Sequence, residues 1–453
     1  MIDLTKLYDR TPKTDKVYDV IVAGGGPAGI GAALAAAVNG ASVLILEGRS
    51  HFGGTAAAAM WMRFNWLYRD NDYHTRGGVN KIFADTVEKW GPVAAIKGDK
   101  EGLMKRGAMH DGGNLSIHPE YLKKILFDLF ERYGIDYTLY SPVIGVVKDG
   151  AAIRGVIAQC KEGKVTYRGK VVIDATGDGD VAYNAGCEME NRGSSVSGWR
   201  APITLLFALI NVDTDRFFEW YLADKIVLRG IDFPNRREAM TYAAQLGYFV
   251  PTHFSSDRGT VPGIVNFNYQ TTRGWFFDGL DSYDLTCVEK LGIIQAAEFM
   301  RFAKDLAVPG LEKAELLRTG AFAAVRETRR LAGEYVFTEA DLLNGTDFPD
   351  EIARKYGGRD PMGEKNPGVN IKQGAQYPYR SLLPKDIDGL LVAGRCGSTT
   401  FDGHYGGKSM GNMMVMGQAA GVAAALCSKN GVQPRALDYK LIQKKLDEMG
   451  VVL

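Results

Sequence analysis

Short apolar runs and a helix-forming stretch alternate at the start of the chain. Residues 18–23 form an apolar run interrupted only by Asp19, which is typical of a buried parallel strand. The alanine-rich stretch 30–39 predicts a helix that ends at Gly40, a residue suited to a helix C-terminus. A second apolar run, 41–46, predicts another buried strand. Together these segments predict one strand–helix–strand unit of about 30 residues.

After this unit the chain has an irregular aromatic stretch, then a predicted helix and several predicted strands. A segment that we expect to form a second lobe follows, and the chain then returns to the strand–loop–helix pattern. Apolar periodicity and turn residues predict the following elements: a helix at 118–133, strands at 135–148, 151–159, 164–174 and 203–212, an amphipathic helix at 284–306, a strand at 389–394 and a small-residue helix at 413–427. Because 453 residues exceed what one core usually holds, we expect two lobes.

The composition is that of an ordinary globular protein. Apolar residues make up 46% and charged residues 24% of the chain, and the net charge is +1. This balance lacks the basic surplus that nucleic acids and anionic membranes attract, so we expect neither as a partner. The first 16 residues are polar, unlike a signal peptide, and the apolar run 30–38 is too short to span a bilayer. These features predict a cytoplasmic protein.

The five cysteines are widely spaced along the chain: Cys160, Cys187, Cys287, Cys396 and Cys427. They form no C-x-x-C or C-x4-C pair, so their spacing predicts neither a dithiol redox centre nor a structural zinc site. We therefore predict no bound metal, and free thiols fit a reducing compartment.

A glycine motif follows the first predicted strand and opens the first predicted helix. It reads Gly24-x-Gly26-x-x-Gly29. Gly24 allows a tight turn, Gly26 lets a pyrophosphate approach the backbone, and Gly29 lets helix and strand pack closely. Glu47, at the end of the second predicted strand, suits the hydroxyl pair of a ribose. The motif therefore predicts a dinucleotide site.

A double glycine, Gly53-Gly54, follows Glu47 after a short interval and favours FAD over NAD as the dinucleotide. Many flavoproteins have such a pair where the chain turns back along FAD, whereas NAD enzymes have no need of it. His51 lies in the same stretch. It is either a loop histidine near the cofactor or a point of covalent flavin attachment, and the sequence leaves both interpretations open.

Two later strands also end in small residues. The first runs into Ala175-Thr176-Gly177, where small side chains let the chain cross beneath a dinucleotide. The aspartates around this segment, at 174, 178 and 180, fit a solvated turn better than a metal site. The second strand ends at Gly394-Arg395 and leads through a glycine-rich loop to a helix. The N-terminus of that helix can stabilise negative charge on a reduced flavin.

These four segments, in this order, resemble the FAD-dependent oxidoreductase family with a glutathione-reductase-type flavin fold, which is related to the flavoproteins of fumarate reductase and succinate dehydrogenase. The resemblance covers most of the chain and includes 173–180, 325–330 and 379–395. It implies FAD as the cofactor and an oxidoreductase activity. The motifs and the resemblance together predict these FAD-binding residues: Gly24, Gly26, Pro27, Ala28, Gly29, Glu47, Gly48, Arg49, Gly53, Gly54, Thr55, Val143, Ala175, Thr176, Gly177, Gly394, Arg395, Gly407 and Met410.

The C-terminal loop departs from the fumarate reductase pattern H-G-x-x-R-x-G-G. The arginine of that pattern falls on His404 and its histidine on Thr400. Because that arginine binds the dicarboxylate, the departure argues against fumarate or succinate as the substrate. In the closer subfamily an arginine often stands at the position of Lys408. Some steroid dehydrogenases of the wider group keep an aromatic, glycine-rich loop here, which leaves carbon–carbon desaturation open.

Flavin chemistry needs a proton donor or acceptor in addition to hydride transfer at the flavin N5 atom. His404, whose unperturbed pKa of about 6.5 suits either proton role, is the first candidate, and Tyr405 and Lys408 follow. The arginines at 326, 329 and 330 share one face if this stretch is helical. They then fit a salt-bridged helix between the lobes or, as the alternative, an anionic substrate. The stretch 61–66 fits a pocket wall and packed core equally.

The sequence thus predicts an α/β protein with two domains. One is a Rossmann-type FAD-binding domain with a discontinuous parallel sheet, at 1–190 and 376–453, carrying an aromatic-rich insertion at about 60–110. The other is a second α+β domain at 191–375, which caps the first and contacts the substrate.

The predicted activity is hydride transfer between a small organic substrate, an alcohol or a carbon–carbon bond, and the flavin N5 atom. Two alternatives stay open: a flavin subunit that passes electrons to an iron–sulfur partner protein, and a flavin monooxygenase. The sequence lacks the W-x-W-x-I-P halogenase motif and the G-D-A-A-H loop of aromatic hydroxylases, which speaks against the second. Assembly into a homo-oligomer also stays open.

Overall fold

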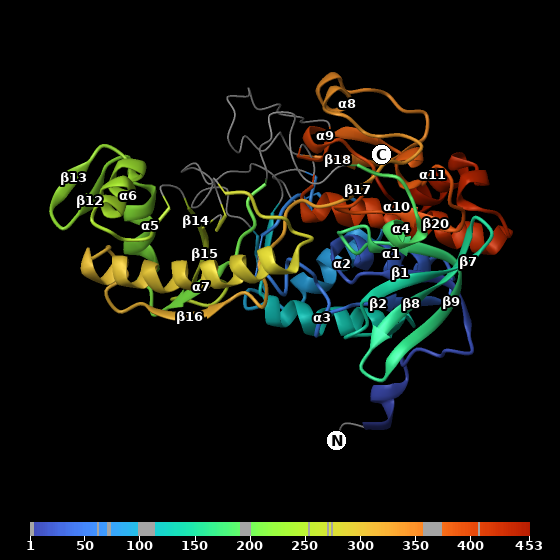
Figure 1. Ribbon diagram of the computed structural model, residues 1–453, viewed down its shortest axis with the longest axis horizontal. Helices are drawn as coiled ribbons and strands as arrows, with labels where there is room; N and C mark the ends of the chain where they lie inside the picture. The colour runs from blue at the N-terminus through green and yellow to red at the C-terminus, as the bar shows by residue number, and fades with distance from the viewer. Residues whose placement is uncertain are drawn as a thin grey trace.

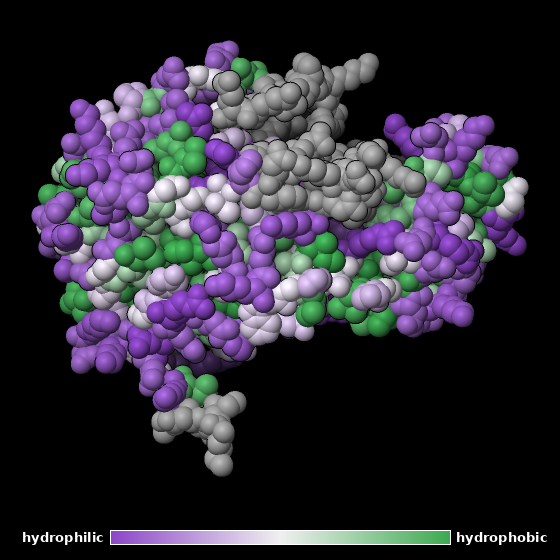
Figure 2. Space-filling view, turned by 180° about the vertical axis from the view of Figure 1, so that it is seen from behind, coloured by the Kyte–Doolittle hydropathy of each residue, from purple (hydrophilic) through white to green (hydrophobic). Residues whose placement is uncertain are grey.

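The computed structural model describes residues 4–60, 63–69, 74–97, 114–190, 201–251, 254–269, 271–272, 275–356, 374–405 and 408–453. Figure 1 shows an elongated molecule with a larger lobe at one end and a smaller lobe at the other. The long helix α7 (Ser282–Asp305) runs from the smaller lobe towards the larger one (Figure 1). Figure 2, viewed from the opposite side, shows polar and apolar residues interspersed over both lobes.

The larger lobe is built on a seven-stranded sheet with the order β6-β2-β1-β9-β8-β7, in which β20 also pairs with β9. Its strands are β1 (Val17–Ala23), β2 (Val43–Leu46), β6 (Asp136–Thr138), β7 (Val143–Asp149), β8 (Ala152–Cys160), β9 (Gly163–Asp174) and β20 (Leu390–Val392). β6, β2, β1, β9 and β20 are parallel, whereas β7 and β8 form an antiparallel extension. The central parallel strands are buried on both faces, which is why they read as continuous apolar runs.

Two small-residue helices cover one face of this sheet: α1 (Pro27–Val38) and α10 (Met410–Asn430). A Cβ built on Gly417 would clash with the carbonyl oxygen of Ala28, and one on Gly421 with that of Ala32. The two backbones are therefore in direct contact, and the helices run in the same direction. Among the described residues, α10 alone is long and apolar enough to cross a membrane, but 89% of its apolar window is buried. It is a core helix of this fold.

Replacing Gly421 by valine should destabilise the protein by about 3 kcal/mol, because the new side chain would force α1 and α10 apart. Urea unfolding followed by circular dichroism measures the change. Lys429→Val is the matched control, since it places the same side chain in the same helix outside the α1 contact. We expect that control to change stability by about 0.5 kcal/mol or less. Equal unfolding midpoints for the two variants would contradict the backbone contact.

The smaller lobe is an antiparallel sheet packed against α7, with the strand order β14-β15-β11-β16. Its strands are β11 (Phe207–Ile210), β14 (Ser255–Arg258), β15 (Val265–Asn268) and β16 (Glu315–Thr319). Phe207 and Phe267 stack in its core with ring centroids 5.1 Å apart, and Phe299 of α7 lies 4.8 Å from Phe267. The lobe also holds α5 (Thr214–Leu222), α6 (Arg236–Gln245) and the hairpin β12 (Ile226–Leu228) and β13 (Ile231–Phe233).

Shorter elements complete the described chain. The helices are α2 (Gly78–Glu88), α3 (Pro119–Arg132), α4 (Asp180–Ala185), α8 (Glu339–Asn344), α9 (Phe401–Tyr405) and α11 (Tyr439–Glu448). The strands are β3 (Arg63–Phe64), β4 (Ala95–Lys97), β5 (Leu115–Ile117), β10 (Met189–Glu190), β17 (Arg330–Leu331), β18 (Glu351–Lys355) and β19 (Ala375–Pro378). Three single-turn helices are η1 (Leu4–Tyr8), η2 (Tyr379–Leu382) and η3 (Pro434–Ala436).

The predicted α/β fold class is confirmed, but two predicted elements were wrong. The single strand at 135–148 is two strands, because Pro142 interrupts it and lacks the N–H group that a sheet ladder needs. The stretch 326–330, expected to be a helix or a turn, is extended chain that leads into β17. In extended chain neighbouring side chains point apart, so Arg329 and Arg330 reach different partners. The domain boundaries near 190 and 375 stay predictions.

Candidate functional site

The glycine segments predicted from the sequence meet at one edge of the main sheet. β1, β2, β9 and β20 are parallel, so their carboxyl ends lie together, where open α/β sheets bind ligands. Gly24 follows β1 and contacts Ala175, which follows β9: a Cβ on Gly24 would clash with the Ala175 carbonyl. Gly394 follows β20 and approaches α1, where its Cβ would lie 2.8 Å from the Cβ of Ala28.

The three motif glycines before α1 have different surroundings. Gly24 has φ +100°, and a Cβ on Gly29 would clash with the Gly24 carbonyl, so both glycines are needed for the turn itself. A Cβ on Gly26 would meet just one described atom within 4 Å, the Cα of Gly54 at 4.0 Å. No described side chain caps the N-terminus of α1 at Gly26. The backbone N–H groups at the start of α1 and the positive end of its helix dipole fit the pyrophosphate of FAD.

The Glu47 carboxylate is held by two backbone N–H groups. Gly25 donates to Oε2 at 2.9 Å and Arg49 donates to Oε1 at 2.9 Å. Burial raises the pKa of Glu47, although these hydrogen bonds oppose the shift. A carboxylate oxygen can accept more than one hydrogen bond, so Glu47 keeps the capacity to accept from ribose hydroxyls.

The other predicted FAD-binding residues near Glu47 lie on both sides of it. A Cβ on Gly48 would lie 3.1 Å from the Cβ of Pro142, which precedes Val143 at the start of β7. The Arg49 guanidinium lies 3.2 Å from the centroid of the Phe322 ring. Gly53 has φ +107°, and Thr55 is half-buried in the turn that follows.

His51 lies in this turn with 9% of its surface exposed. Its Nδ1 is 2.9 Å from the Ser50 hydroxyl, and its Nε2 has no hydrogen-bond partner among the described residues. Burial, together with the nearby Lys123 ammonium, lowers the pKa of His51. The position keeps the interpretation as a loop histidine and that as a covalent attachment point open.

The turn after β9 depends on Asp174, which is fully buried. Its carboxylate accepts from the Thr176 hydroxyl at 2.7 Å and from the Ala182 N–H at 2.9 Å. Burial raises the pKa of Asp174 despite these hydrogen bonds. The prediction of three solvated aspartates was therefore wrong for this residue, because its side chain holds the turn together. Among the described residues, no three His, Cys, Asp or Glu side chains gather as a metal site.

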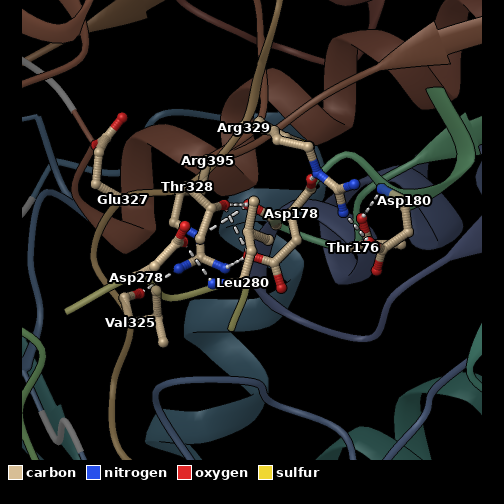
Figure 3. A network of polar contacts seen from close by, with 12 residues as sticks. Thr176, Asp178, Asp180, Asp278, Leu280, Val325, Glu327, Thr328, Arg329 and Arg395 are labelled. Atoms are coloured by element: carbon tan, nitrogen blue, oxygen red, sulfur yellow. Dashed lines mark hydrogen bonds and ion pairs between the residues drawn. The ribbon is translucent and has the colours of Figure 1, made fainter. Parts of the chain in front are cut away.

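The Arg395 side chain binds the turn after β9 and also the segment that contains Val325. Its Nη2 donates to Asp178 at 2.6 Å and its Nε to the Gly177 carbonyl at 2.9 Å, while its Nη1 donates to the Val325 carbonyl. Asp178 also accepts from the Thr328 hydroxyl at 2.7 Å. Figure 3 shows this network, in which chain segments that are distant in sequence converge on Asp178. The guanidinium thus fixes the backbone beside the predicted cofactor.

The N-terminus of α10 extends beyond that of α1 in the same direction. Gly417 lies against Ala28, close to the start of α1, and Met410 begins α10 seven residues earlier. At 1.5 Å per residue this offset is about 10 Å. The Ser409 side chain does not cap α10, while the Gly411 N–H in the first turn donates to the Asn65 carbonyl at 2.9 Å. The two helix ends therefore suit an extended ligand with its pyrophosphate at α1 and its ring system at α10.

His404, on α9, lies in a buried polar cluster. It is 1% exposed, and its Nε2 is 3.3 Å from Oε2 of Glu327. The other oxygen of Glu327 accepts from Arg330, whose Nε donates to the Thr399 carbonyl at 2.8 Å. Burial is the largest cause that holds the pKa of His404 well below its usual value, and Lys408 contributes next. The imidazole is therefore neutral at neutral pH, unlike the predicted side chain that titrates near 6.5.

The other residues predicted for this loop are Tyr405, Gly407 and Lys408. The half-buried Lys408 acts electrostatically on both His404 and Glu327. Tyr405 is the last residue of α9, and its side chain lies outside what the structure describes. Gly407 also lies outside the described residues.

The family described as "FAD dependent oxidoreductase" matches residues 19–446 of this chain. The chain belongs to this family. The protein is accordingly an FAD-dependent oxidoreductase and an enzyme, and FAD is its cofactor. The glycines around α1, with room beside Gly26 and an uncapped helix end, fit that cofactor.

Relatives with more specific names are distant. The chain is 27% identical over 214 residues to a digeranylgeranylglycerophospholipid reductase of Picrophilus torridus, which covers 45% of this chain and 50% of the relative. The chain thus spans about half the length of this curated relative. Solved structures with a similar fold include a geranylgeranyl bacteriochlorophyll reductase-like protein of Thermoplasma acidophilum, at 17% identity and TM-score 0.47 over 96% of this chain and 84% of that one. Another is the p-nitrophenol 4-monooxygenase PnpA of Pseudomonas putida, at 12% identity and TM-score 0.48 over 94% and 83%.

The sequence alone assigns no role to Glu327 or to Lys355, a buried lysine that faces the rings of Phe337 and Tyr377. Glu327 was part of a recognised segment, and a single carboxylate among three arginines within six residues was the signal that could have identified it. Lys355, at the end of β18, has no comparable signal, because its surroundings come from distant segments of the chain.

Proposed function

We propose that this enzyme transfers a hydride between a small organic substrate and the N5 atom of FAD. The observation that carries the proposal is the pair of parallel helix ends, at Gly26 before α1 and at Ser409 before α10, where neither N-cap residue caps its helix with a side chain. The first suits the pyrophosphate. The positive dipole end of the second suits the negative charge that a flavin gains on reduction.

The residues proposed to hold FAD line the carboxyl edge of the sheet. Gly24, Gly26 and Gly29 with the start of α1 would bind the pyrophosphate, and Glu47 would accept from the ribose hydroxyls. The turn at Ala175 to Gly177 and the residues Gly394 and Met410 would follow the rest of the cofactor. FAD supplies the hydride chemistry when bound, and these residues orient it.

His404 and Glu327 are proposed to manage the proton that accompanies the hydride. The imidazole is neutral, and burial raises the pKa of the Glu327 carboxyl. Nε2 of His404 and Oε2 of Glu327 lie 3.3 Å apart, and neither atom has a hydrogen-bond partner among the described residues, so each can donate to or accept from a substrate. Lys408 lies next to them and favours negative charge in the same region.

Anaerobic reduction of the flavin tests this proposal. The holoenzyme is mixed with panels of alcohols, amines and compounds with a saturated bond beside a carbonyl, and the flavin absorbance is followed. Bleaching by one class, with one equivalent of oxidised product per flavin, is the expected result. Incorporation of labelled oxygen into a product would instead identify a monooxygenase. Electron delivery to a copurifying iron–sulfur protein, with no reduction by any small molecule, would support the subunit alternative.

A further inference from the structure

A buried lysine beside the His404 cluster has no hydrogen-bond partner. Lys355 is 1% exposed, and among the described residues no acceptor lies within hydrogen-bond reach of its Nζ. The ammonium is 4.6 Å from the ring centroid of Phe337 and 4.4 Å from that of Tyr377. Buried lysines are almost always paired, because an unpaired charge loses its hydration without compensation. Aromatic faces offset only part of that loss. An unpaired group of this kind indicates a missing ligand.

Phe337 connects Lys355 to the helix that carries His404. The Thr400 N–H donates to the Phe337 carbonyl at 2.8 Å, and a Cβ on Gly403 would lie 2.6 Å from the same oxygen. Thus α9 packs directly on the backbone of the residue whose ring Lys355 faces. In agreement with this arrangement, the charge of Lys355 is one of those that lower the pKa of His404.

Two lysines bring positive charge to this buried region. Arg330 and Glu327 neutralise each other, and His404 is neutral. Lys408 adds a positive charge that acts on both Glu327 and His404. Burial lowers the pKa of Lys355 from 10.5 to about 7, so near neutral pH it is partly protonated. A buried ammonium without an acceptor, in a region of low dielectric, favours an anion.

We infer that Lys355 is the centre of an anion-binding site and that the substrate of the enzyme carries a carboxylate that binds there. A carboxylate would give the Nζ of Lys355 its missing acceptor and would neutralise its charge. Tyr356, the next residue after Lys355, exchanges two hydrogen bonds with Asn412 in the first turn of α10, whose positive dipole end would add to the attraction. The identity of the anion as the substrate rests on the proposed function, whereas the anion site itself does not.

The melting temperature of the holoenzyme in acetate tests the site. Acetate replaces chloride at constant ionic strength, so that general screening is unchanged. We expect a saturable rise of about 2 °C or more for the wild type. Lys355→Met, which keeps the length of the side chain without its charge, should melt higher than the wild type in chloride and show at least about a tenfold loss of acetate affinity. Lys385→Met is the matched control, since Lys385 is exposed and pairs with Glu188. It should keep the acetate response.

An equal acetate response in the wild type and Lys355→Met, or no response in the wild type, would overturn the anion site. Lys355→Gln, also neutral, replaces the methionine variant if that one does not fold. Inorganic phosphate is titrated in the same way, and a response to phosphate with none to acetate would overturn the carboxylate assignment. Flavin reduction is measured separately. An acetate response without any reducing substrate would leave the site standing and remove the proposed function.

Discussion

Replacing Gly26 by valine should leave the protein folded and abolish FAD binding. A Cβ at this position meets no described protein atom closer than 4.0 Å, so the fold has room for a side chain. The same space is where the pyrophosphate must approach the N-terminus of α1, and valine would fill it. We expect FAD occupancy below about 10% of the wild type, with an unchanged far-ultraviolet circular dichroism spectrum. Flavin released by acid and counted against protein measures the occupancy.

Gly145→Val is the matched control for this variant. Gly145 lies in β7, where a Cβ would make ordinary contact with Ile157 at 3.6 Å, far from the glycine motif in the chain. It should keep full flavin. Gly24→Val and Gly29→Val are unsuitable for this comparison, because their side chains would clash with backbone carbonyls and disturb the turn itself. Full FAD occupancy in Gly26→Val would refute the nucleotide assignment.

Replacing His404 by alanine should preserve FAD and lower turnover by about 100-fold or more, the usual effect of removing a proton-transfer group. The variant leaves Glu327 bonded to Arg330 but removes the imidazole that lies 3.3 Å from its other oxygen. Steady-state rates with the substrate identified by flavin reduction measure the loss. His404→Gln, whose amide can donate or accept a hydrogen bond at the same position, should recover part of the rate.

The lowered pKa of His404 has two consequences for the pH dependence of the enzyme. Because the folded pKa of His404 is well below its unfolded value, the imidazole stays neutral as the pH falls through about 6.5. Wild-type turnover should therefore show no limb that belongs to this histidine near 6.5. The stability that His404 contributes is present above its unfolded pKa and declines as the pH falls below it. An alanine variant with unchanged rates would remove His404 from the mechanism.

Local patterns were enough to predict the elements that carry the nucleotide motifs. The apolar runs at 18–23 and 41–46 became β1 and β2, since strands buried on both faces must be apolar throughout. The small-residue stretch at 413–427 became part of α10, because only small side chains allow its contact with α1. In these cases the residues that favour the element locally, apolar in the strands and small in the helix, are also the residues that its packing requires.

Local patterns do not predict residues whose conformation is imposed from elsewhere in the fold. The arginines at 326, 329 and 330 have helical spacing, but the stretch is extended because its carbonyls and side chains bond to segments far away in the chain. Arg395 binds the Val325 carbonyl, Arg329 binds Asp180, and Arg330 binds the Thr399 carbonyl. The surroundings of Lys355 could not be predicted either, because the rings of Phe337 and Tyr377 that it faces come from other segments of the chain.

The absorption spectrum of the purified protein, before and after acid precipitation, tests the account most directly. Bands near about 370 and 450 nm, with the yellow colour released into the supernatant, are predicted for FAD held without a covalent bond. Colour that stays in the pellet would identify covalent attachment, with His51 as the first residue to replace. A colourless protein that added FAD does not turn yellow would contradict the cofactor assignment and everything proposed from it.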